Sequence, residues 1–530
     1  MSRRTQVING TEYVFEDQPY WDSKKKRGAH KRVYIGKNVN GKFVANKKFL
    51  LQQELNKVKK DIRSGPISTE KYIRKFYGAV YLLEQIGELT GVNHDLKLCF
   101  PDSYKQILSI VHYMVLESNP LYRFKKWNHI HKHTYGKDIP SQRSSELFTT
   151  IGEAEKMKFF TKQAKRRLET EFLAFDTTSI SSYSQLIKQV KFGKNKEGDN
   201  LPQINLALLL GEETGLPVYY RKLPGNLPDV KTIDKLLKDI SVFQLDKVKL
   251  VMDRGFYSAD NINAMYKNHY KFLIGAKLSL SIVNKKLDTI RDEIRTRKNY
   301  HVEVGVFAKG CLQEWPYKEI KSQTGEEINE TRRIYVHYYY NDQKATDDRM
   351  RFYHELDRLE EELHCGKRKP EHESKYNKYF KITTTPVRGI KVEPKQEVID
   401  QAEKNFGYFV LMSNGLKDPI EALNIYRTKD LIEKSFENLK EHLNMRRESV
   451  SSEEGLEGKL FLQFVALIYT CYIKKVMDDK KLFAKYSMKE LLDELDIIEI
   501  YQEPGNRSHI GEITGKQKMI YEAMGVEIPT

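Results

Sequence analysis

Short apolar runs and amphipathic segments alternate through the central part of the chain. The apolar runs predict five strands, at 171–176, 201–210, 216–223, 247–253 and 271–276. The turn residues Gly211–Gly215 predict a hairpin between the second and third runs. Apolar residues at helical spacing predict helices at 230–243 and directly after Ser258, which can cap the second helix. Three antiparallel strands followed by alternating helices and strands predict a mixed sheet with helices on both faces.

Two of the apolar runs end on an aspartate. Asp176 follows the run at 171–176, and Asp253 follows the run at 247–253. In open α/β sheets, functional groups lie at the C-terminal ends of buried strands. Taken singly, each residue fits equally well an aspartate that caps a turn. The pair therefore predicts a site only in combination with further residues.

A third acid lies in the segment YRTKDLIEKSFENLK, residues 426–440, which predicts an amphipathic helix. Its apolar stripe is formed by Ile432, Phe436, Leu439 and Leu443. An adjacent edge, within an arc of about 60° at helical spacing, carries Tyr426, Lys429, Glu433 and Lys440. Two ammonium groups, a phenol and one carboxylate suit a site that holds both a metal and a polyanion. A single glutamate on such a helix is otherwise a solvated residue.

The order of these elements resembles the RNase H-like catalytic domain of DDE transposases, with aspartates on the first and fourth strands and a glutamate on a late helix. The third-acid helix resembles that of the insertion-sequence group with the motif Y-x-x-R-x-x-x-E-x-x-x-x-x-x-K. Tyr426, Glu433 and Lys440 match this motif in type and spacing, whereas Lys429 stands where the group has Arg. The segments Asp176-Thr-Thr-Ser and Asp253-Arg-Gly-Phe-Tyr-Ser also resemble that group. The resemblance covers about 170–475.

The resemblance implies that Asp176, Asp253 and Glu433 are catalytic and ligate metal. Two hard cations about 3.5–4 Å apart activate a water or a 3′-hydroxyl and neutralise the leaving oxygen. Carboxylate ligands favour Mg²⁺, with Mn²⁺ as a possible substitute. By resemblance, Asp176 would bridge both ions, and the other two acids would each complete one.

The same resemblance implies that Tyr426, Lys429 and Lys440 hold the DNA strand by its phosphates. Lys at position 429 lacks the bidentate fork of Arg and would orient a phosphate less strictly. Arg254, directly after the second aspartate, is a further candidate DNA contact. An aromatic candidate is Trp315, between the second and third acids. It would either stack on a flipped base while a DNA hairpin forms, as the resemblance implies, or pack in a small core.

The expected function is that of a transposase that binds the ends of its mobile element, cleaves DNA and joins the 3′ ends to target DNA. Its partner would be double-stranded DNA, both terminal inverted repeats and target, bound by a homodimer in the synaptic complex. An RNase H-fold nuclease without strand transfer and a catalytically inactive DNA-binding derivative are the alternatives. The setting of Glu433 and the long insertion favour the transposase over the nuclease, and the complete acid triad argues against the inactive form.

Charge agrees with a nucleic-acid partner. Lys and Arg outnumber Asp and Glu by 90 to 73, and residues 1–48 hold 12 basic residues against 4 acidic ones. Strands predicted at 12–21 and 33–36 flank a basic tip, which predicts a β-hairpin that contacts DNA phosphates. A generically solubilising loop is the alternative. The basic residues concerned are Lys24, Lys25, Lys26, Arg27, Lys31 and Arg32.

The whole chain is predicted to be an α/β protein with an RNase H-like mixed sheet flanked by helices, a strand-rich insertion before the third-acid helix, an N-terminal β-hairpin and a helical DNA-binding region. Helices are expected at 46–62, 69–90, 101–117 and 152–168. The expected regions are a basic hairpin at 1–48, a helical DNA-binding or dimerisation region at 49–168, two catalytic parts at 169–280 and 413–478, the insertion at 281–412, and a C-terminal region at 479–530.

Other features narrow the setting. The four cysteines are scattered and no signal peptide is visible, so we expect the bacterial cytoplasm, in association with the nucleoid. The apolar segment 460–473 is too short to span a membrane, and no membrane partner is expected. His129, His131 and His133 predict a satisfied cluster or a DNA-facing basic patch rather than a metal site.

Overall fold

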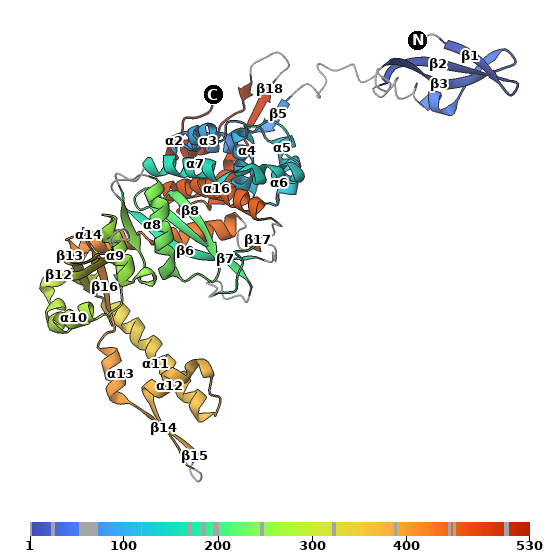
Figure 1. The fold of residues 1–530 in the computed structure, drawn as a ribbon. Helices are drawn as coiled ribbons and strands as arrows, with labels where there is room; N and C mark the ends of the chain where they lie inside the picture. Colours follow the sequence, from blue (N-terminus) through green and yellow to red (C-terminus); the bar gives the residue numbers. More distant parts are fainter. Residues whose placement is uncertain are drawn as a thin grey trace. The chain divides into compact units, whose positions relative to one another are not determined.

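The computed structural model describes residues 3–22, 27–51, 53, 73–117, 119–166, 171–182, 187–193, 201–243, 248–320, 325–385, 389–443, 447–448, 452–502 and 508–530 (Figure 1). The chain forms two compact units. The first comprises Met1–Arg74 and Ile500–His509, and the second comprises Lys75–Glu499 and Ile510–Thr530.

The first unit contains a four-stranded antiparallel meander in the order β1-β2-β3-β4. Its strands are β1 Arg3–Ile8, β2 Thr11–Asp22, β3 Arg27–Val39 and β4 Lys42–Ala45. Asn-Gly pairs at 9–10 and 40–41 make two of its turns, and all four residues have positive φ, as tight hairpin turns require. The predicted β2–β3 hairpin is confirmed and longer than expected. Its tip residues Lys24, Lys25 and Lys26 lie outside the described residues.

A ten-stranded mixed sheet dominates the second unit, in the order β11-β12-β13-β16-β10-β9-β6-β7-β8 with β17 beside β6. The chain up to residue 276 contributes β6 Leu173–Ser182, β7 Gln203–Gly211, β8 Pro217–Pro224, β9 Lys249–Met252 and β10 Lys271–Ala276. The later strands are β11 Tyr300–His301, β12 Val306–Ile320, β13 Glu327–Tyr340, β16 Tyr408–Ser413 and β17 Arg447–Glu448. Strand β9 runs parallel to both β6 and β10, whereas β7 runs antiparallel to its two neighbours, β6 and β8.

The elements expected between 171 and 276 are confirmed, including α8 Thr232–Val242 and α9 Ala259–Lys267. Ser258 caps α9 by accepting a hydrogen bond from the backbone N–H of Asn261. One boundary was wrong, because β6 continues past Asp176 to Ser182. The extra residues are Thr, Ser and Ile, and they pair with β7 along their length, so a polar but buried stretch remains strand. Asp176 is the one residue of β6 that is not buried.

The segment predicted as an insertion, 281–412, contains strands that pair with the main sheet. Strands β12 and β13 form a long hairpin that joins the central sheet through β16. Among the described residues, a second and separate small core lies within 342–406. That segment contains α11 Asp342–His364, α12 Glu373–Tyr379, β14 Phe380–Thr385, β15 Gly389–Pro394 and α13 Gln396–Glu403 (Figure 1). Helix α10, Ser281–Ile294, precedes β11.

Helices from both ends of the chain complete the second unit. The N-terminal set is α2 Gly78–Leu89, α3 Val92–Cys99, α4 Tyr104–Glu117, α5 Phe124–Ile130, α6 Ser141–Thr150 and α7 Glu153–Lys165. The C-terminal set is α16 Glu453–Asp479, α17 Met488–Asp496 and α18 Gly515–Ala523. The helices predicted at 101–117 and 152–168 are confirmed as α4 and α7. The helix predicted at 69–90 is confirmed only from Gly78, because 73–76 is strand, and the one predicted at 46–62 lies mostly outside the described residues. Short strands β5 Ile73–Phe76, β18 Glu499–Gln502 and β19 His509–Ile510 form a small sheet.

Helix α16 is longer than the 460–473 segment expected from the sequence. By length and composition it could cross a membrane, but 78% of its most apolar window is buried inside the protein. It packs against α4, α6 and β8, joining the helical region to the edge of the main sheet. This is the environment of a core helix.

Candidate active site

Asp176 and Asp253 lie on neighbouring parallel strands. The register pairs Phe175 with Met252, so the two aspartates follow one residue further along β6 and β9. Neighbouring strands lie about 4.8 Å apart, which places the two residues side by side. The backbone N–H of Thr177 donates to Asp176 Oδ1 at 2.7 Å and orients that carboxylate. Sheet pairing therefore assembles two of the three predicted acids.

The segment that carries the third acid is not the single α-helix that its spacing predicted. Helix α14, Pro419–Arg427, ends before Lys429, and α15, Asp430–Glu437, follows and passes into a π-helical turn, η7, at Asn438–His442. At the break, the Thr428 hydroxyl donates to the carbonyl of Ile425 at 2.5 Å and competes with the helical backbone pattern. The predicted apolar stripe is confirmed, with exposed fractions of 1–6% at Ile432, Phe436, Leu439 and Leu443.

The break directs Tyr426 at Asp253. The Tyr426 hydroxyl donates to Asp253 Oδ1 at 2.7 Å. Burial and the neighbouring Asp253 carboxylate raise the pKa of Tyr426, and Asp176 adds to the same effect, so the phenol stays protonated as a donor. Burial opposes ionisation of Asp253, yet the Tyr426 hydrogen bond and the cations Lys429 and Arg254 hold its pKa below the ordinary value.

Lys429 lies between two of the acids. Its Nζ is 3.7 Å from Asp253 Oδ1 and 3.6 Å from Glu433 Oε1. The Lys429 side chain is 24% exposed, whereas that of Glu433 is 63% exposed. The structure thus links Glu433 to Asp253 through an ammonium group, at the position where the resembled motif has Arg.

The comparisons with known proteins bear on this arrangement. Residues 167–469, more than half of the 530, match the family model described as the transposase DDE domain. The chain belongs to the DDE transposase domain family. No curated protein matches the chain. One solved structure, a piggyBac transposase synaptic complex with hairpin DNA, is similar at 11% identity over 79% of this chain and 70% of that chain, with a TM-score of 0.33. A score that low carries no conclusion about the present chain.

The DDE transposase domain supplies carboxylates of the right chemistry for a divalent ion. All three candidate donors are carboxylate oxygens, which Mg²⁺ prefers and which do not favour Zn²⁺. Within the described residues, no group of three or more His, Cys, Asp or Glu side chains is drawn together closely enough to hold a metal. The ammonium of Lys429 occupies the space between Asp253 and Glu433. The three carboxylates are the kind of ligand that Mg²⁺ prefers. The Lys429 ammonium already lies between the carboxylates of Asp253 and Glu433.

The other predicted site residues differ in their exposure and in the elements that carry them. Arg254 is exposed and starts a short 3-10 turn, η4, Arg254–Phe256. Lys440 is half-buried in the π-helical turn, where the wider winding rotates it relative to Glu433. Arg27, Lys31 and Arg32 are exposed on the meander of the other unit. There Arg32 donates to Gln6 Oε1 at 2.9 Å.

Trp315 requires a correction. It was a candidate for stacking on a flipped base, but the side chain is only 4% exposed. The indole N–H donates to Asn263 Oδ1 at 2.9 Å, which anchors β12 to α9. A buried indole with a satisfied donor is a packing residue, so Trp315 has no face for a base in this conformation.

The histidines after α5 are structural. His131 contacts Asp496 Oδ2 at 2.9 Å and His133 contacts Ser109 Oγ at 2.9 Å. Both side chains are buried, and burial lowers the pKa of His133 to about 4. They tie the helical region together. The satisfied arrangement therefore holds for His131 and His133, whereas His129 is exposed on α5.

Two residues near the acids were missed by sequence reasoning. A Cβ at Gly275 on β10 would lie 2.9 Å from Tyr426 Oη and 3.0 Å from the backbone nitrogen of Arg254. Only glycine therefore leaves room for the Tyr426 contact. A glycine inside a predicted strand is a signal for such close approach, and it was available in the sequence. Asp229 accepts a 2.6 Å hydrogen bond from the Thr177 hydroxyl and had no sequence signal.

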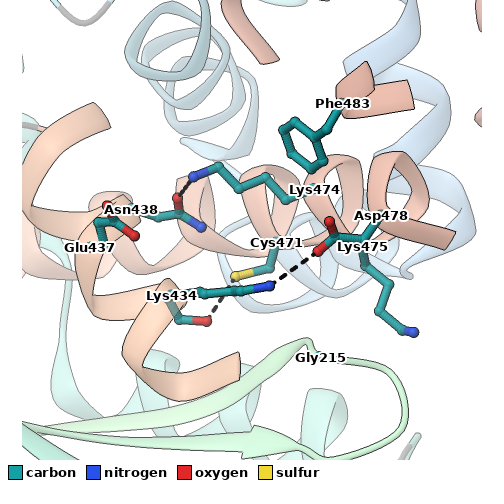
Figure 2. Close-up of a pocket in the computed structure, with 10 residues that line it drawn as sticks. Gly215, Lys434, Glu437, Asn438, Cys471, Lys474, Lys475, Asp478 and Phe483 are labelled. Atoms are coloured by element: carbon teal, nitrogen blue, oxygen red, sulfur yellow. Dashed lines mark hydrogen bonds and ion pairs between the residues drawn. The ribbon is translucent and has the colours of Figure 1, made fainter. Parts of the chain in front are cut away.

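A pocket of about 190 Å³ lies on the other side of α15, between that helix, α16 and the β7–β8 turn (Figure 2). Its lining side chains pair with each other. Lys434 reaches Asp478 Oδ2 at 3.4 Å, and Ser435 Oγ lies 3.4 Å from Cys471 Sγ. Burial raises the pKa of the Cys471 thiol to about 11, which leaves it neutral and unreactive. Residues of α15 line this pocket, but none of the three predicted catalytic acids does.

Proposed function

We propose that the protein is a transposase that binds the ends of its mobile element, cleaves the DNA with divalent metal and joins the 3′ ends to target DNA. The observation that carries the proposal is that Tyr426 and Lys429 both contact Asp253 and that Lys429 also contacts Glu433. Asp176 lies on the neighbouring parallel strand. Membership of the DDE transposase domain family supports the reaction class. The strand order β8-β7-β6-β9-β10, with β9 parallel to its neighbours, supports an RNase H-like core.

In the proposed site, Asp176, Asp253 and Glu433 hold Mg²⁺, or Mn²⁺ in its place. The bound ions supply an activated nucleophile and neutralise charge on the leaving oxygen. Tyr426 fixes the Asp253 carboxylate by its 2.7 Å hydrogen bond, which keeps that ligand oriented. Lys429 lies between two of these acids, and its ammonium would be available to a DNA phosphate if the acids paired with metal instead. Arg254 and Lys440 are the further phosphate contacts proposed here.

The proposed partner is double-stranded DNA, both element ends and target, held by a homodimer in the bacterial cytoplasm. The formal net charge of +17 and the exposed Arg27, Lys31 and Arg32 of the meander support a polyanionic partner. The meander would add affinity through phosphates, whereas the acids would perform the chemistry. Affinity and cleavage should therefore be separable by mutation.

The test is cleavage of a duplex that carries an element end. Asp176→Asn, Asp253→Asn and Glu433→Gln should each lower Mg²⁺-dependent cleavage by roughly 10²-fold or more while end binding, measured in Ca²⁺, remains near the wild-type value. Glu437→Gln is the matched control, because Glu437 is exposed one turn further along α15 and should retain cleavage. A variant of one of the three acids that cleaves normally would remove that residue from the ligand set.

The same assay separates the alternatives. A transposase joins the released 3′ ends to a second duplex, so joined products should appear in Mg²⁺ and disappear with EDTA. Cleavage without joined products would identify a nuclease of the same fold. Tight end binding with no cleavage by the wild-type protein would identify a DNA-binding derivative that has lost catalysis.

A further inference from the structure

A polar hollow of about 440 Å³ lies on the second unit, away from the acids. Four elements border it: the end of α9, the start of β10, the outer half of β13 and the residue after β16. The basic residues that line it are His269, Lys271, Arg332 and Arg333. The remaining lining residues are Tyr266, Thr331 and Asn414, so the described lining contains no carboxylate.

Hydrogen bonds fix the walls of this hollow. The Tyr266 hydroxyl donates to the Arg333 carbonyl at 2.8 Å and ties β13 to α9. Asn414 accepts from the Phe272 N–H and donates to the Tyr270 carbonyl, both at 2.9 Å, which ties β16 to β10. His269 turns the chain from α9 into β10 with a φ of 57°. These hydrogen bonds therefore hold the backbone that forms the walls of the hollow in a defined arrangement.

The charge of the hollow is only partly balanced. Glu330 lies 2.7 Å from Arg332 Nη2, and the Arg332 guanidinium also lies over the Tyr317 ring at 5.0 Å. The nearby Glu319 is engaged with Lys267 at 3.1 Å. Lys271 and Arg333 are both exposed and face the same hollow. A concave surface with several cations and hydrogen-bond donors, and little apolar lining, suits phosphate groups.

The hollow lies at the opposite end of the central strands from Asp253. Strands β9 and β10 are parallel, Asp253 follows the C-terminal end of β9, and Lys271 begins β10. Lys271 precedes Gly275, the neighbour of Arg254 and Tyr426, by four residues, or about 13 Å of extended strand. One phosphate cannot contact both places. A ligand of the hollow is a different stretch of nucleic acid from the strand that reacts.

We propose that this hollow binds backbone phosphates of duplex DNA outside the reacting segment, with Lys271 and Arg333 as the principal contacts. The inference rests on the proposed function, because it assigns a second DNA contact to the same transposase. The second unit would then contact DNA through residues other than the three acids and the N-terminal meander. Its removal should weaken binding without altering the chemistry at the acids.

The experiment uses the full-length protein and a random-sequence duplex of 50 base pairs, with the dissociation constant measured over a salt series. The double variant Lys271→Gln/Arg333→Gln should flatten the log–log salt dependence by about 0.9 for each phosphate that the protein no longer neutralises. The matched control is Arg297→Gln/Lys298→Gln, which removes the same charge from two exposed residues of the turn before β11. The control should retain the wild-type slope, and thermal unfolding should show both variants folded.

A slope for Lys271→Gln/Arg333→Gln equal to that of the control would overturn the proposal. Inorganic phosphate provides a second outcome. If phosphate raises the melting temperature of the wild-type protein but not of the double variant, while the DNA slope stays unchanged, the hollow takes small phosphates and the DNA assignment is wrong. Failure of the proposed function would differ from both results, since it would appear as normal cleavage by the acid variants whatever the salt slope.

Discussion

The Tyr426 hydroxyl donates a 2.7 Å hydrogen bond to Asp253 Oδ1, although 173 residues separate the two. The contact passes over Gly275, whose missing Cβ leaves space for the phenol. The same oxygen lies 3.7 Å from Lys429 Nζ, so Tyr426 orients the Asp253 carboxylate while Lys429 balances its charge. A residue of the predicted DNA-contact set is thus a positioning residue for a predicted metal ligand.

Gly275→Ala should impair cleavage by displacing this hydrogen bond. The new Cβ would lie 2.9 Å from Tyr426 Oη and 3.0 Å from the backbone nitrogen of Arg254, so one of these atoms must shift. Shifts of about 1 Å can cost roughly 10²-fold in rate, and overpacking costs about 1–3 kcal/mol of stability. Single-turnover cleavage and thermal unfolding measure the two effects.

Gly255→Ala is the control, because its Cβ would have no neighbour closer than Asp229 Oδ2 at 3.9 Å. That variant should cleave at a near-normal rate. A double-mutant cycle with Tyr426→Phe adds a second check, since removal of the hydroxyl should reduce the cost of Gly275→Ala. Additive effects of the two changes would show that Gly275 does not act through Tyr426.

Trp315→Ala should destabilise the protein by about 3–5 kcal/mol and slow every DNA step alike, because it empties a buried site. Trp315→Phe should cost less, since it keeps most of the packing and removes only the 2.9 Å hydrogen bond to Asn263. Denaturant unfolding and time-resolved cleavage give the two measurements. A stable Trp315→Ala protein that nicks normally yet stalls before double-strand release would restore the base-stacking role.

Neutralising the basic hairpin should flatten the salt dependence of DNA binding. Replacing Lys24, Lys25, Lys26 and Arg27 by Gln should lower the log–log slope by about 0.9 for each phosphate that these side chains had neutralised. Cleavage at saturating protein should change little, because these residues are remote in the sequence from the acids and contribute affinity. Replacement of the three lysines by Arg, which keeps the charge, should preserve the slope. An unchanged slope in the Gln variant would show that the tip is only solvated.

Acid should weaken the link between the helical region and the sheet. Glu457 lies 2.8 Å from Lys156 Nζ and 3.0 Å from Lys222 Nζ, and both lysine side chains are buried. Burial opposes ionisation of Glu457, but the two lysines hold its pKa below the ordinary value. A lowered pKa in the folded state contributes stability above the unfolded pKa, about 4.3, and that stability is lost as the pH falls through the folded pKa.

Glu457→Gln should therefore be less stable than wild type at pH 7, and its stability should fall less steeply below about pH 4.5. Urea unfolding between pH 3 and 7 measures the difference. Glu454→Gln, on an exposed residue of the same helical turn, should keep the wild-type pH dependence. Identical acid slopes for Glu457→Gln and wild type would mean that the ion pairs do not stabilise the fold.

Local pattern was sufficient for most elements of the catalytic core. Strands β6 to β10 and helices α8 and α9 follow from apolar runs, helical spacing and turn residues, because each of these signals acts over a few residues. Prediction from local pattern failed where pairing with distant strands, and not the local composition, decided the structure. The Thr-Ser stretch after Asp176 is strand because it is paired and buried, and β12 and β13 belong to the main sheet because β16 returns beside them.

By itself, the sequence determined the order of the elements, the acids that follow apolar runs, the basic hairpin and the apolar stripe of the third-acid segment. Tertiary structure alone decided that Asp176 lies beside Asp253, that Tyr426 reaches Asp253 across Gly275, and that Lys429 bridges two acids. It also decided that Trp315 is buried. Periodicity reports which face of an element is apolar, but strand register and the break at Thr428 depend on partners far away in the sequence.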